Sequence, residues 1–335
     1  MKFNKESIKT ILSKRVSYLI LIGLMLIVGL INPHFFSVRV FKDILTQASI
    51  KMIMALGMTF VIITYNTDLS SGRLVGLAAV IAGSLAQTST YYNKFFPELP
   101  ELPVIVPVLV CMLIGAIVGL INGIIITKFR VDSFIATLGT QLAIFGVTSL
   151  YYDLEPNASQ PIGGFTKSFS KLATGSFLGV PYLIIMAIIV TVICHVLLKY
   201  HKYGKTVYAV GGNKAASIIA GIDANRIIII ALMIEGLLAG FSGCLEAART
   251  GGATNTYGVN YEFDAMCACI VGGVSLNGGV GDIPGVVAGV LIFQLIQYGM
   301  TFVGINPYWQ NIIKGLIVVC AVAIDMSKSD KKDNK

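Results

Sequence analysis

The residues best suited to bind a solute or to take part in a reaction are the few polar side chains that interrupt the long apolar runs of this chain. The first group is TDLSSGR at 67–73, which contains Asp68, Ser70, Gly72 and Arg73. Irregular backbone at membrane depth is tolerated where it faces protein or water, so this break could line a route for a polar solute. It could also be structural, with Asp68 or Ser70 capping the next helix and Arg73 anchoring that helix at the membrane surface.

A second break of the same kind lies in GVSLNGGVG at 273–281. The stretch 67–85 resembles 273–291, because each is a Ser/Gly break that leads into a run of small apolar residues. Interrupted spans at corresponding positions of two halves point to a substrate path near the membrane midplane. The candidate path residues are therefore Asp68, Ser70, Gly72, Arg73, Ser275 and Asn277.

Charged residues inside other apolar runs are a third group. Glu235 and Glu246 share one helix face, and Lys314 is expected to pair with one of them, either for function or for stability. Lys51 is expected near the outer end of its span, with its ammonium group reaching the interface. Asp264 is expected to cap the segment that it begins.

Catalytic, metal and nucleotide sites are not indicated by any visible spacing. The three His are scattered, and no Ser/His/Asp or Cys/His arrangement is assembled. The six Cys lie in apolar runs, and Cys267 and Cys269 fit neither a zinc knuckle nor a CxxC pair. No GxxxxGK[ST] phosphate loop occurs, so we expect no ATPase site, metal or cofactor in this chain.

The elements that must position these residues are membrane spans. Of the 335 residues 55% are hydrophobic and only 13% charged, whereas a soluble domain carries about 25% charged residues. The sequence predicts an all-α polytopic membrane protein with about ten spans, of which the third and eighth are short. The apolar segments are 17–35, 44–64, 74–88, 104–127, 133–152, 181–199, 227–248, 263–275, 284–304 and 308–325.

The distribution of Lys and Arg predicts the orientation. If the N-terminus is cytoplasmic, most Lys and Arg fall in cytoplasmic loops, as the positive-inside rule requires. The predicted organisation is a cytoplasmic segment 1–16, one transmembrane domain 17–325 and a cytoplasmic tail 326–335. The outer loop 153–180 is expected to contain an interfacial helix within 165–178.

The longest polar interruption is a cytoplasmic loop at 200–226, which contains a short helix candidate. Asn213 suits the N-cap and Gly221 suits the position after the end. A small-residue helix of this kind could dock on another protein, or could simply connect two spans. The residues concerned are Gly212, Asn213, Ala215, Ala216, Ala220 and Gly221.

Small-residue motifs predict close helix packing. Gly115, Gly119 and Gly123 form a double GxxxG on one helix face, and Gly236–Gly240 and Gly285–Gly289 repeat the spacing. The packing could lie within one subunit or between two copies.

Taken together, these stretches resemble the membrane permease subunits of sugar-uptake ABC importers of the ribose, xylose and galactose group. The resemblance covers nearly the whole chain and includes FIATLGT (134–140), YGKTVYAVGGNKAASIIAGI (203–222) and CIVGGVSLNGGVG (269–281). Within the group, TDLSSGR, ATNTYG (253–258) and NPYWQ (306–310) resemble the galactose and methyl-galactoside branch.

This resemblance implies a homodimer in the bacterial inner membrane, a cytoplasmic ABC ATPase that binds ATP, and an extracytoplasmic sugar-binding protein. It implies that 212–221 couples to the ATPase and that Asp68, Ser70 and Gly72 belong to the sugar path. The alternatives are a permease of the same group for ribose, xylose or nucleosides, an ion-coupled secondary transporter, and, last, a membrane-embedded enzyme.

Overall fold

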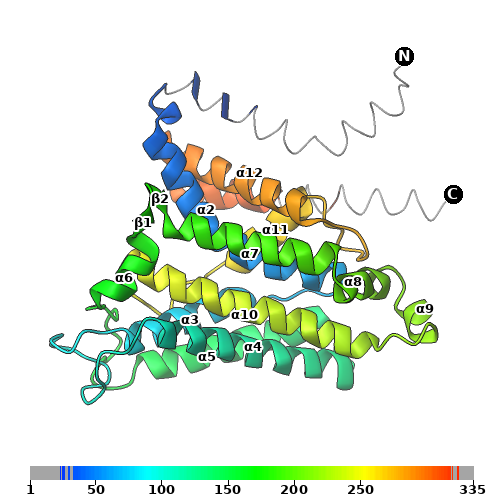
Figure 1. Cartoon of the computed structure of the whole chain (residues 1–335), viewed down its shortest axis with the longest axis horizontal. Helices are drawn as coiled ribbons and strands as arrows, with labels where there is room; N and C mark the ends of the chain where they lie inside the picture. Colours follow the sequence, from blue (N-terminus) through cyan, green and yellow to red (C-terminus); the bar gives the residue numbers. More distant parts are fainter. Residues whose placement is uncertain are drawn as a thin grey trace.

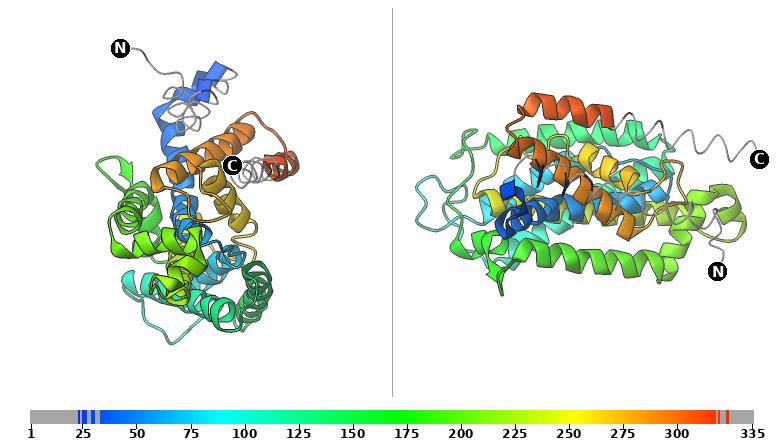
Figure 2. Two further views of the ribbon diagram at one scale, coloured as in Figure 1. Left: turned by 90° about the vertical axis from the view of Figure 1, so that its right-hand side faces the viewer. Right: turned by 90° about the horizontal axis from the view of Figure 1, so that it is seen from above.

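The computed structural model describes residues 33–317 and seven isolated positions, 23, 25, 26, 29, 30, 319 and 323. Its helices run along one common axis, so the bundle is seen end-on in the left view of Figure 2. The predicted segments 1–16 and 326–335, and most of the first span, lie outside the described residues.

Among the described residues, six helices are long and apolar enough to cross a membrane. Their bounds are α2 Val38–Ile63, α4 Ile105–Lys128, α5 Ser133–Tyr152, α7 Tyr182–Lys199, α10 Ala224–Thr250 and α12 Ile283–Phe302. Two shorter helices, α3 (Ser71–Leu85) and α11 (Tyr261–Val271), occupy the third and eighth apolar segments, which confirms that these are short. A further helix covers 307–317, within the predicted tenth span.

The two ends of the bundle carry different short elements. A 3-10 helix, η1 (Pro33–Phe36), precedes α2. One end, here called the α6 end, bears α6 (Lys167–Thr174) and the antiparallel strands β1 (Ser176–Phe177) and β2 (Val180–Pro181). The other, here called the α9 end, bears α8 (Lys202–Gly212) and α9 (Lys214–Ile219), as Figure 1 shows. α6 confirms the helix expected within 165–178.

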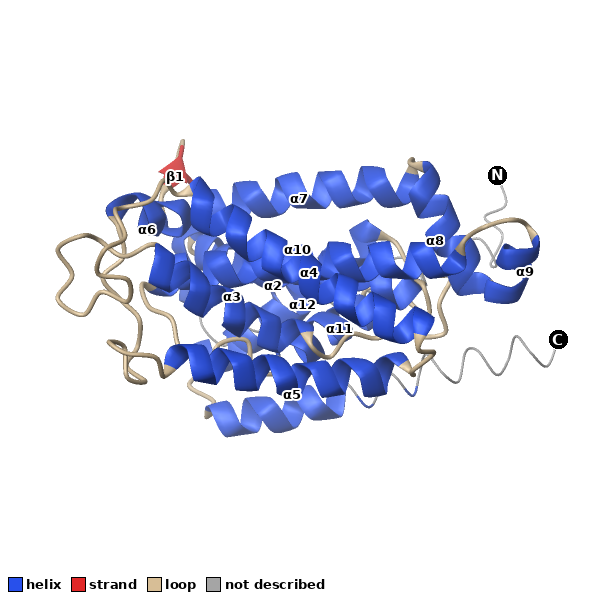
Figure 3. Cartoon of the chain, turned by 90° about the horizontal axis from the view of Figure 1, so that it is seen from below, coloured by secondary structure: helices blue, strands red, loops and turns tan. Residues whose placement is uncertain are grey.

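The core is built on α10, which packs along α2, α3 and α4. Most residues of α2 and α10 are buried, whereas most residues of α4, α5 and α7 are exposed or only partly buried. Figure 3 shows α5 and α7 on opposite sides of the bundle. Such a distribution is expected if lipid or another subunit covers the outer helices.

The GxxxG motifs pack within the subunit. Gly115 and Gly119 of α4 lie against the backbone of Gly236 and Leu232 of α10. Gly123 lies against Ile229, one turn further along the same helix. In α12, the Gly285–Gly289 motif lies against α11, because a β-carbon on Gly285 or Gly289 would meet the carbonyl oxygen of Gly272 or Ala268, respectively.

Two irregular segments enter the bundle from opposite ends. After α2, residues 64–70 turn back from the α9 end before α3 begins. After α10, residues 251–260 turn back from the α6 end before α11 begins. The first turn of α3 meets the second segment where Gly72 faces Gly258, next to the carboxylate of Glu262 in α11.

Candidate functional site

The first irregular segment is held by its own side chains. The Asp68 carboxylate accepts from the Ser70 amide at 2.8 Å and from the Ser70 hydroxyl at 2.6 Å. The Ser70 hydroxyl in turn accepts from Asn122 Nδ2 of α4 at 2.9 Å. All three side chains are buried. Asp68 therefore supports the backbone that leads into α3. The expected side-chain cap is not formed, since Ser70 occupies the N-cap position of α3 without a capping hydrogen bond from its side chain.

Polar side chains of α5 bind both irregular segments. Ser133 Oγ accepts from the Thr67 amide at 3.2 Å, and Thr137 Oγ1 accepts from the Leu69 amide at 3.1 Å. Further along α5, Gln141 Nε2 donates to Glu262 Oε1 at 3.1 Å. Ser149 Oγ accepts from Asn255 Nδ2 at 3.2 Å. Successive members are four or eight residues apart, so they form a row that is inclined to the helix axis.

Arg73 of α3 packs against α5. Its guanidinium lies 4.3 Å from the centroid of the Phe145 ring in α5. One turn away on α5, Gln141 donates to Glu262 of α11. A guanidinium stacks favourably on an aromatic face, which explains how a charge is held between two helices.

Glu235 and Glu246 lie in separate environments although they share one side of α10. Glu235 is fully buried, and neither oxygen of its carboxylate has a hydrogen-bond partner among the described residues. Glu246 lies near the α6 end, where its carboxylate forms a 2.8 Å ion pair with Arg249 and accepts from the Tyr261 hydroxyl at 3.2 Å. Eleven residues separate the two by about 16 Å along a helix, which is why their surroundings differ.

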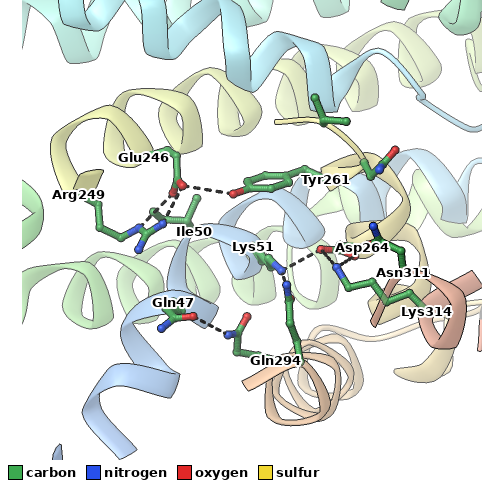
Figure 4. A pocket seen from close by; sticks show the side chains of 13 residues that line it. Gln47, Ile50, Lys51, Glu246, Arg249, Tyr261, Asp264, Gln294, Asn311 and Lys314 are labelled. Carbon is green, nitrogen blue, oxygen red and sulfur yellow. Dashed lines mark hydrogen bonds and ion pairs between the residues drawn. The ribbon is translucent and has the colours of Figure 1, made fainter. Parts of the chain in front are cut away.

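A polar cavity of about 310 Å³ lies beside Glu246 and extends to the middle of α2 (Figure 4). We call it the Asp264 cavity. Its lining residues are Gln47, Ile50, Lys51, Glu246, Arg249, Val259, Asn260, Tyr261, Asp264, Gln294, Gln297, Asn311 and Lys314. It thus joins α2, α10, α11, α12 and the 307–317 helix.

The centre of this cavity is an ion-pair network on Asp264. Lys51 Nζ lies 2.8 Å from Asp264 Oδ2, and Lys314 Nζ lies 3.1 Å from Asp264 Oδ1. Lys51 also donates to Gln297 Oε1 at 2.5 Å. The three charged side chains are largely buried. The network ties three separate helices together through one carboxylate.

Three expectations about these charges were wrong. Lys314 pairs with Asp264, and not with Glu235 or Glu246. Lys51 lies midway along α2, because that helix begins at Val38, and its ammonium group turns inward. Asp264 is no cap, since α11 begins after Asn260 and the carboxylate binds lysines from other helices. The paired residues are 213 and 50 positions apart, so their pairing leaves no local signal in the sequence.

Ser275 and Asn277 lie at the α9 end, away from Asp68 and Ser70. Asn277 lines a larger cavity there together with Tyr65, Asn66 and Arg130. The second Ser/Gly break contacts the end of α2, because the Gly279 amide donates to the Ile63 carbonyl at 2.9 Å.

The loop helix predicted at 212–221 is α9. Asn213 is its N-cap and accepts from the Ala216 amide at 2.9 Å, and Gly221 follows its end with a φ of +83°. Of the residues in α9 only Ser217 is buried. Ile219 is 88% exposed, so an apolar side chain lies on the surface of this helix.

Several cavity residues were also missed. Gln47, Gln294 and Gln297 are amides within apolar runs, and Gln294 and Gln297 share a helix face at i, i+3. That pattern was visible in the sequence, but the cavity that it faces was not.

Comparison with known proteins identifies the family to which this chain belongs. Residues 40–322 match the family model described as the permease component of branched-chain amino acid transport systems. The chain belongs to this permease family. The chain is also 44% identical to the galactose/methyl galactoside import permease MglC of Escherichia coli K12, over 98% of each chain.

Two further sugar permeases match the chain over nearly its full length. MglC of Haemophilus influenzae is also 44% identical, over 96% of each chain. The ribose import permease RbsC of Bacillus subtilis is 36% identical over 95% of this chain and 94% of its own. No solved structure matches this member of the permease family.

Proposed function

We propose that this multi-pass membrane protein is the permease subunit of an ATP-driven importer of galactose or methyl galactoside. The observation that carries the proposal is the 44% identity, over nearly full length, to permeases named for those sugars. Ribose permeases of the same family are less similar, at 36–37%. Ribose, followed by xylose or a nucleoside, is the alternative substrate.

In this proposal the α9 end faces the cytoplasm of a bacterium and both termini are cytoplasmic. The end bears Lys202, Lys205, Lys214 and Arg226, and cytoplasmic loops are enriched in such residues. α9 docks on a separate ABC ATPase, which binds the ATP. The exposed side chains of Ile218 and Ile219 support this role, because an exposed apolar patch at a protein end marks an interaction site.

The α6 end and the outer helices contact the binding protein, a second copy of the chain and lipid. The α6 end receives sugar from an extracytoplasmic binding protein. The exposed faces of α4, α5 and α7 provide the area for a second copy of the chain and for lipid. The irregular segments at 64–70 and 251–260 supply polar groups along the sugar path.

A mechanical route leads from α8 and α9 into the bundle. The Tyr208 hydroxyl of α8 donates to the Gly281 carbonyl at 2.7 Å. Burial, and then Asp282, raise the pKa of Tyr208, so the hydroxyl stays a donor at neutral pH. The loop 272–282 binds the end of α2 through Gly279 and continues into α12. Movement of α9 by the ATPase would thus be passed to α2 and α12.

The experiment is reconstitution of the chain in vesicles with its ATPase and binding protein, followed by uptake of radiolabelled galactose. We expect uptake that needs ATP and all three proteins, and weaker competition by ribose and xylose than by methyl galactoside. Galactose uptake by this chain alone, driven by an ion gradient, would establish a secondary transporter and overturn the proposal.

A further inference from the structure

The Asp264 cavity contains a buried hydrogen-bond acceptor that lacks a donor. Gln294 is 2% exposed, and its Nε2 donates to Gln47 Oε1 at 3.2 Å. Its Oε1 has no hydrogen-bond partner among the residues that the structure describes. A buried acceptor left unpaired costs about 1–3 kcal/mol. Gln294 is one of the residues that line the cavity (Figure 4), so a small shift of its side chain would bring the unpaired oxygen within reach of a hydroxyl of a bound molecule.

The charges of the cavity favour a neutral ligand over an ion. Arg249 is paired with Glu246, and Lys51 and Lys314 are both paired with Asp264. A charged ligand would have to break one of these pairs, at the cost of leaving a charge buried without its partner. A hydroxyl group can instead both donate to a carboxylate and accept from an ammonium group while the pairs persist.

The shape and the remaining lining suit a small ring. The volume of about 310 Å³ lies at the lower end of the range of about 300–1,000 Å³ for small-molecule sites. The Tyr261 ring, Ile50 and Val259 add apolar surface to the amides and charges. A pyranose has the matching combination of apolar C–H faces and hydroxyl edges.

The location places the cavity on a route through the membrane. Arg249 is in the last turn of α10, at the α6 end, whereas Lys51 lies midway along α2. The cavity therefore connects the end proposed to receive sugar with the middle of the bundle. Five helices contribute to its wall, so a shift of any of them would change it.

We propose that the Asp264 cavity is a binding site for a neutral monosaccharide on its way through the permease. Gln294 accepts from a sugar hydroxyl, and Asp264 and Glu246 offer carboxylate oxygens to others. The inference deepens the proposed function and rests on it. The two tests below distinguish a failure of the cavity assignment from a failure of the proposed transport function.

The first test is transport by the complex of permease, ATPase and binding protein in vesicles. Gln294→Leu should raise the galactose concentration for half-maximal uptake at least tenfold, while ATP hydrolysis without sugar stays within twofold of wild type. The control is Gln310→Leu, a buried glutamine outside the cavity whose amide binds Thr301 and the Ile305 carbonyl. It should lower the amount of folded protein without changing half-saturation.

The second test needs no buried substitution. Asn311→Cys in the cavity and Tyr308→Cys beside it should both react with a charged thiol reagent added at the α6 end. The five Cys that the structure describes are buried, which keeps the background low. Galactose should slow labelling at position 311 at least threefold and leave position 308 unchanged, whereas sucrose, as an osmotic control, should slow neither.

The outcomes separate the two hypotheses. If the wild-type complex does not take up galactose, the proposed function fails. If it does, and Gln294→Leu has wild-type half-saturation or galactose gives no protection at position 311, the cavity is no sugar site although the function stands. Protection by sulfate or phosphate in place of galactose would show an anion site and would also overturn the inference.

Discussion

Gly115 of α4 and Gly236 of α10 face each other so closely that a β-carbon on either would overlap the carbonyl oxygen of the other. The relationship is reciprocal, and Gly119 and Gly240 continue it one turn away on each helix. The two GxxxG motifs are therefore halves of one contact inside the subunit. Small residues permit this approach because no side chain stands between the backbones.

Gly115→Ala should destabilise the permease by about 1–3 kcal/mol, because the added methyl group must push the two helices apart. A lowered melting temperature in detergent would show this. The matched control is Gly139→Ala in α5, where a β-carbon would meet nothing within 4 Å and Ala also favours the helix. Equal melting temperatures for the two variants would refute the packing explanation.

Asp264→Asn should be much more damaging than Lys314→Met. The first change leaves Lys51 and Lys314 as two neighbouring cations without a carboxylate, and breaking a buried pair in this way costs about 3–5 kcal/mol. The second leaves the Lys51–Asp264 pair in place. Thermal unfolding of the two purified variants decides the order, and a Lys314→Met protein less stable than Asp264→Asn would contradict it.

Thr137→Val should disturb the segment that leads into α3. The substitution keeps the side-chain shape but removes the acceptor of the Leu69 amide, which costs about 1–3 kcal/mol when the amide is buried. We expect lower stability and slower uptake. Thr140→Val is the control, since Thr140 Oγ1 donates only to a carbonyl of its own helix, that of Thr137. A control variant as impaired as Thr137→Val would sink this explanation.

Ile219→Glu should reduce association with the ATPase at least tenfold, which corresponds to about 1.4 kcal/mol. Burial of this exposed side chain against a partner is favourable, and a carboxylate there would be desolvated. Leu178→Glu is the control, because Leu178 is equally exposed, at 88%, but lies at the α6 end. Co-purification measures both.

Ala216→Trp tests the same surface without adding charge, because Ala216 is exposed on α9. A bulky residue at Gly221 would be less informative, since its φ of +83° strains any side chain. Undiminished ATPase binding by both Ile219→Glu and Ala216→Trp would exclude α9 as the docking element.

The sequence by itself determined which segments are apolar, which of them are short, and where a capped helix interrupts the α9 end. These features are local, because span length, hydropathy and capping depend on residues within a turn or two of one another. The family resemblance was also readable from contiguous stretches. Asn213 and Gly221 took the positions in α9 that their types predict.

Only the tertiary structure decided which polar residues meet. Lys51, Asp264 and Lys314 come from three distant parts of the chain, and each alone is compatible with an interfacial or capping role. Gln294 is one more amide in an apolar helix until Gln47 and the cavity are placed beside it. A buried charge must find a partner, but its choice depends on how the helices pack, and that packing involves residues far apart in sequence.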